Sequence, residues 1–131
     1  MGSNMSELLT CISRRISHVI SSKFPGTAQA INAVIRSIEE EPEKIIDINP
    51  QLYIRLVNEF SNLHLILIVS FPNENWIYEI LAALQGSEDL TRVLLKNRDQ
   101  IIRYCDEQPV EASSTRINAI EEALMRNASC H

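Results

Sequence analysis

The sequence predicts an all-α fold, with six or seven amphipathic helices packed around a central apolar helix at about residues 63–71. Apolar residues recur at helical spacing through most of the chain, and capping or helix-stopping residues separate these segments. Residues 63–71 are apolar at every position except His64 and Ser70, so we expect protein to cover this helix on nearly every side. The pattern fits a globular bundle and a short array of helix pairs equally.

Length and composition indicate one soluble domain. The chain has 131 residues, of which 45% are hydrophobic. We expect a single helical domain at 6–128, between a leader or disordered N-terminus (1–5) and a disordered C-terminus (129–131). The net charge of −5 argues against a nucleic-acid-binding protein, which usually carries a basic surface.

The number and spacing of the cysteines predict that they are reduced thiols in a cytoplasmic protein. Cys11, Cys105 and Cys130 are odd in number and form no CxxC pair. The N-terminus matches a myristoylation pattern, and we expect membrane association only if Gly2 is a native acceptor. We favour the alternative, in which residues 1–4 are a leader left by cloning and Met5 is the native start.

The first half of the chain predicts two helices and the start of the central one. A helix at 6–23 ends at Pro25-Gly26, and a second, capped by Thr27, ends at the acidic run 39–43, which reads as a solvated turn. Asn49-Pro50 is a strong start signal. From there we expect either one helix to about Ser70, or two helices with a break near Asn62.

The second half predicts three more helices. Pro72-Asn73 opens a helix with Trp76 and Ile80 inward, and Gly86 ends it. A single continuous helix is expected from 87 to about 107, with Asn97 on its buried side. After Pro109, a last helix begins at 113 or 114. Its apolar stripe consists of Ile117, Ile120 and Leu124.

No residues form a recognisable catalytic, cofactor or metal site, so we expect a protein that is not an enzyme and has no cofactor. Cys11 and His18 lie two helical turns apart, too far for a direct hydrogen bond, and read as surface residues. We expect His64 to be a core or boundary residue, and burial there would lower its pKa. Asn97 reads either as a buried amide that selects a helix partner or as a boundary residue bonded to water or a carbonyl.

The leading functional hypothesis is a non-enzymatic protein–protein interaction domain, such as an adaptor, inhibitor or assembly subunit. Tyr78 points away from the buried face of its helix, and exposed tyrosines are enriched in binding patches. Arg92, Lys96 and Arg103 form a basic stripe that would suit the rim of such an interface. The alternatives are a homo-oligomer, including a homodimer, and, with less support, an enzyme with a pocket between helices.

Overall fold

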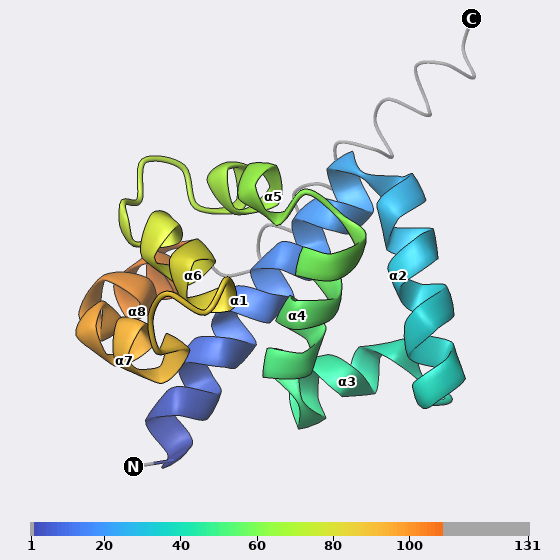
Figure 1. The fold of residues 1–131 in the computed structure, drawn as a ribbon, viewed down its shortest axis with the longest axis horizontal. Coiled ribbons are helices and arrows are strands. Elements are labelled where there is room, and N and C mark those ends of the chain that lie inside the picture. Colours follow the sequence, from blue (N-terminus) through green and yellow to red (C-terminus); the bar gives the residue numbers. More distant parts are fainter. Residues whose placement is uncertain (1, 109–131) are drawn as a thin grey trace, which may run out of the picture.

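The computed structural model describes residues 2–108, and side chains from Met5 onward. This part of the chain contains eight helices and no strand, which confirms the all-α prediction (Figure 1). The expected last helix, with Ile117, Ile120 and Leu124, lies outside the described residues. The helices are α1 (Gly2–Lys23), α2 (Pro25–Ile38), α3 (Pro42–Ile48), α4 (Pro50–Phe60), α5 (Leu63–Ser70), α6 (Trp76–Leu84), α7 (Leu90–Lys96) and α8 (Arg98–Glu107).

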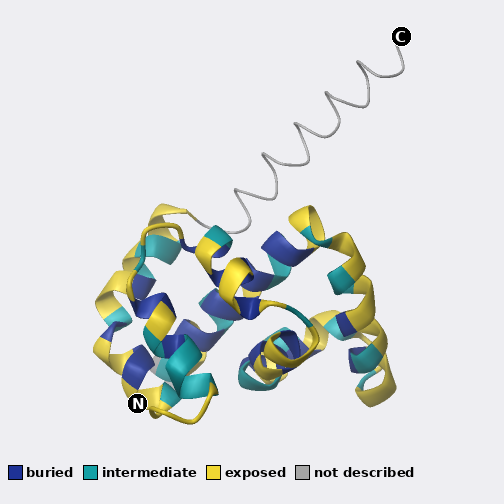
Figure 2. Cartoon of the chain, turned by 45° about the horizontal axis from the view of Figure 1, so that its top comes forward, coloured by how far each residue is buried: buried dark blue, intermediate teal, exposed yellow. Residues whose placement is uncertain are grey.

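Helix α1 occupies the centre of the fold. It packs against α2, α3, α4, α5, α7 and α8. Figure 2 shows buried positions along the length of α1 and on the inward sides of the helices around it. Its apolar face supplies much of the core through Leu8, Ile12, Ile16 and Ile20. The 22 residues of α1 span about 33 Å, long enough for the shorter helices to pack along it.

Helix α5, which the sequence placed at the centre, is instead covered on one side only. Ile66 and Leu67 are buried against the core, whereas Leu65 is 50% exposed and Ile68 is also exposed. The expectation that protein covers this segment on nearly every side is therefore wrong. An eight-residue helix needs only one apolar side to pack against α1 and α6, so its remaining apolar residues face outward.

Local signals account for most helix boundaries. The side chain of Asn49 accepts a hydrogen bond from the Leu52 amide at 3.0 Å, which caps α4 as expected. The chain breaks at 61–62, so the two-helix alternative for this region is correct. Gly86 has φ +88°, and the amide of Ser87 donates to the Ala82 carbonyl, as at a glycine-terminated helix end.

The expected continuous helix from 87 to 107 is interrupted at Asn97. This residue has φ −103° and ψ 14°, outside the range of a regular α-helix, and it separates α7 from α8. Its side-chain amide donates to the Val93 carbonyl at 2.9 Å and to Glu79 Oε2 at 2.7 Å. Asparagine competes in this way with the backbone hydrogen bonds of a helix, which explains the break.

Helix α3 was not expected from the sequence. Pro42 begins it and Ile45 is buried in the core, so only residues 39–41 of the acidic run form the link from α2. Helix α2 begins at Pro25 rather than after Thr27. Helix α3 has only seven residues, too few turns for apolar periodicity to define it.

Candidate functional site

The outer sides of α5 and α6 form an exposed patch of apolar and aromatic side chains. His64, Leu65 and Ile68 share the open side of α5, and Tyr78 of α6 is 57% exposed. The rings of His64 and Tyr78 meet edge to face with centroids 5.6 Å apart. We call these four residues the α5–α6 patch. The sequence analysis proposed Tyr78 as a contact residue. It expected His64 to be a core or boundary residue, whereas His64 is exposed.

Polar contacts fix the helix that carries Tyr78. Glu79 accepts hydrogen bonds from Lys96 Nζ and from the Asn97 amide, both at 2.7 Å. These two hydrogen bonds lower the pKa of Glu79, and the hydrogen bond to Glu79 raises the pKa of Lys96. Asn97 is buried and bonded to a carbonyl and a carboxylate, so it joins α7 to α6 directly beside Tyr78.

The basic stripe expected on one helix is divided between two. Lys96 lies on α7 and pairs with Glu79, the residue that follows Tyr78 on α6. Arg92 is exposed on α7, and its charge acts to lower the pKa of Lys96. Arg103 is exposed on α8, beyond the break at Asn97. Of the three cations, the structure thus brings Lys96 to the Tyr78 helix through a direct contact.

A cavity of about 480 Å³ lies between α1, α2, α3 and α4. Ile20, Ile31 and Ile46 supply apolar lining. Its polar lining includes Ser17, Ser21, Asn32, Arg36, Glu43 and Tyr53. Burial raises the pKa of Tyr53 despite a hydrogen bond with Ser17, so this phenol stays protonated near neutral pH. The cavity therefore offers hydrogen-bonding groups, and His64 is not among its lining residues.

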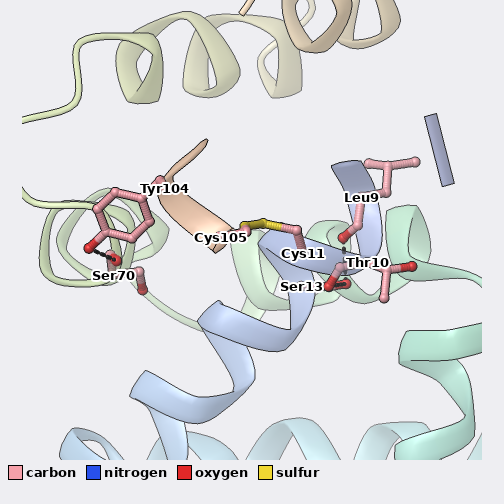
Figure 3. Close-up of a disulfide and its surroundings, with 7 residues drawn as sticks. All are labelled: Leu9, Thr10, Cys11, Ser13, Ser70, Tyr104 and Cys105. Atoms are coloured by element: carbon pink, nitrogen blue, oxygen red, sulfur yellow. Dashed lines mark hydrogen bonds between the residues drawn. A yellow bond between two sulfur atoms is a disulfide. The ribbon is translucent and has the colours of Figure 1, made fainter. Parts of the chain in front are cut away.

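The contact between α1 and α8 corrects the prediction of reduced thiols. Cys11 of α1 and Cys105 of α8 are joined in a disulfide, with Cα atoms 6.4 Å apart (Figure 3). This pairing could not be predicted from the sequence, because 94 residues separate the two cysteines and only the packing of α8 on α1 brings them together.

Arg15 is a second feature of this contact that sequence reasoning missed. It is only 6% exposed, and its guanidinium carbon lies 5.0 Å from the centre of the Tyr104 ring. Burial lowers the pKa of Arg15. A signal was present, since Leu8, Ile12 and Val19 occupy helical positions around Arg15 and all three are buried.

Among residues 2–108, no group of three or more His, Cys, Asp or Glu side chains is placed to hold a metal ion. Within the same range, no helix has the length and apolarity needed to cross a membrane. No family model, no curated protein and no solved structure matches this chain.

Proposed function

We propose that this protein is a non-enzymatic protein-binding domain, and that the α5–α6 patch binds an amphipathic helix of another protein. The observation that carries this proposal is the exposure of Leu65, Ile68 and Tyr78 side by side with His64. Tyrosine is enriched among the residues that dominate binding energy at interfaces, and apolar residues form the centre of such surfaces.

The geometry of the patch favours a helical partner. Leu65 and Ile68 are three residues apart, so they form a ridge along the open side of α5. Ridges of this kind pack into the grooves between side chains of a second helix. An amphipathic helix with apolar residues at three- and four-residue spacing would cover this ridge and contact Tyr78 at its edge.

Charged groups at the border of the patch suit a rim. Lys96 pairs with Glu79, the residue after Tyr78, and its side chain is 64% exposed. A charged rim adds orientation and association rate more than affinity. The patch itself has four residues, which is smaller than the interface of an obligate dimer and suits a reversible complex.

Site-specific crosslinking tests this proposal. A photoreactive phenylalanine replaces Leu65 in the full-length protein, which is then irradiated in its native cell. The control carries the same group at Ile48, an exposed apolar residue at the end of α3. Ile48 lies before the start of α4, and α5 begins after α4 ends. The full length of α4 therefore lies between the control position and α5.

We expect position 65 to crosslink to a different protein that position 48 does not capture. Crosslinking of position 65 to a second copy of this chain would replace the proposal with the homo-oligomeric alternative. Identical products from both positions would contradict a binding role for the patch.

A further inference from the structure

We propose that Cys11 and Cys105 form a reversible dithiol–disulfide site, in which Arg15 stabilises the reduced thiolate and a small disulfide of the glutathione class is the oxidant. This site lies at the contact of α1 with α8, and the inference does not depend on the function of the α5–α6 patch.

The packing around Tyr104 holds the two cysteines together independently of the bond between them. The Tyr104 hydroxyl donates to the Ser70 carbonyl at 3.2 Å (Figure 3). The centre of the Tyr104 ring lies 5.2 Å from that of the Phe71 ring. Ile101, one turn earlier on α8, is fully buried. These contacts hold α8 against the end of α5, and α1 packs directly against both α5 and α8. The reduced thiols therefore stay adjacent, and the bond can open and close without moving the helix.

Arg15 supplies positive charge at the same place. Cys11 and Arg15 are four residues apart, so they are neighbours on the surface of α1, and they reach α8 at the consecutive residues Cys105 and Tyr104. Within residues 2–108, Arg15 forms no ion pair with a carboxylate, and its Nε and Nη2 atoms are buried without a hydrogen-bond partner. A buried cation without an acid partner stabilises an anion that forms beside it.

A carboxylate opposes Arg15 at this contact: the charge of Glu74 also acts on Tyr104 and raises its pKa, but by less than Arg15 lowers it. Burial, with a smaller contribution from Arg15, lowers the pKa of His18, and burial raises the pKa of Tyr104. Both side chains are therefore neutral near pH 7. On α8, Arg103 and Asp106 are exposed and opposite in sign. Positive surroundings of this kind are where reactive cysteines occur, because the thiolate is the nucleophile.

The proposed reaction is ordinary thiol–disulfide exchange. The thiolate of one cysteine attacks a sulfur of oxidised glutathione, which forms a mixed disulfide and releases one glutathione thiolate. The second cysteine loses its proton and attacks the protein sulfur of the mixed disulfide, which releases a second glutathione. Two electrons pass from the protein to the small disulfide, and the two thiol protons are transferred to the two released glutathione molecules.

The first test is an equilibrium titration of the full-length protein. Cys130→Ser leaves only the pair, and the protein is equilibrated in buffers with varying ratios of reduced to oxidised glutathione. After acid quenching and alkylation, mass spectrometry measures the disulfide. We expect the Cys11–Cys105 bond to form and disappear across these buffers. A pair that stays reduced or stays oxidised in all of them, or that only accumulates mixed disulfides, would overturn the proposal.

The second test isolates the role of Arg15. In the reduced Cys130→Ser protein, we expect Arg15→Met to slow alkylation by iodoacetamide at pH 7 at least about threefold, because less thiolate is present. Arg15→Lys, which keeps the charge, should retain most of the rate. Arg14→Met is the matched control, since Arg14 is exposed and pairs with Asp47 on α3. Equal rates for Arg15→Met and Arg14→Met would refute the role of the buried charge.

Discussion

The ring of Tyr78 meets the imidazole of His64 edge to face across the junction of α5 and α6, with centroids 5.6 Å apart. Both residues are exposed, so this contact holds an aromatic side chain in place on the surface of the protein. A side chain that is already ordered loses less conformational entropy when a partner binds. Under the proposed function, Tyr78 is therefore the expected anchor for the partner.

The two sides of α5 predict different costs for the same substitution. Leu67 is fully buried, so Leu67→Ala should lower the free energy of unfolding by about 2–5 kcal/mol, through lost burial and a cavity. Leu65 is half exposed, so Leu65→Ala should change the free energy of unfolding by only about 0.5 kcal/mol. Urea denaturation of both variants measures the difference. Equal losses would show that α5 is enclosed on all sides, contrary to the structure.

The disulfide predicts a stability that depends on redox conditions. It closes a loop between residues 94 apart, and such a crosslink restricts the unfolded chain. Without reductant, Cys11→Ser should lower the free energy of unfolding by about 2–4 kcal/mol. Wild-type protein treated with dithiothreitol should fall to the level of the variant. If reduction leaves the wild-type unfolding curve unchanged, the two thiols are not joined in solution.

We expect the protein to lose stability in acid as Glu79 becomes protonated. The hydrogen bonds of Glu79 with Lys96 and Asn97 lower its folded-state pKa below the ordinary value of 4.5. The unfolded chain therefore binds a proton at higher pH than the folded chain, and the stabilisation from Glu79 is complete above pH 4.5. It is lost as the pH falls through the folded-state value.

Denaturation of wild-type and Glu79→Gln proteins between pH 7 and pH 3 tests this prediction. The stability gap between them should be largest at pH 7 and should shrink below about pH 4.5. Glu59→Gln is the control, because Glu59 is exposed on α4. A gap for Glu79→Gln that stays constant over this range would show that the hydrogen bonds do not favour the charged carboxylate.

The sequence predicted those features of the fold that local chemistry determines. Apolar periodicity and capping gave the all-α class, the start of α4 at Asn49-Pro50 and the end of α6 at Gly86. The break at Asn97 could not be predicted in this way, because the side chain of Asn97 bonds not only to the nearby Val93 carbonyl but also to Glu79, 18 residues earlier in the chain. Tertiary contacts of this kind override local helix preference.

The same limit applies to the candidate sites. Tyr78 could be identified as exposed from its position on one amphipathic helix. The partnership of Tyr78 with His64 depends on how α5 packs against α6, and the pairing of Cys11 with Cys105 depends on how α8 packs against α1. The high apolar content of α5 led to the wrong expectation of full burial. Composition alone does not show whether an apolar residue faces the core or a partner.

The most direct test of the protein-binding proposal uses the partner captured by crosslinking at position 65. Its affinity is measured for the wild-type protein and for variants of the patch. We expect the double variant Tyr78→Ala, Leu65→Ala to bind this partner at least about tenfold more weakly, a loss of about 1.4 kcal/mol. Its melting temperature should stay within a few degrees of that of the wild type. Ile48→Ala should bind normally. Wild-type affinity in the folded double variant would contradict the proposal that the α5–α6 patch binds the partner.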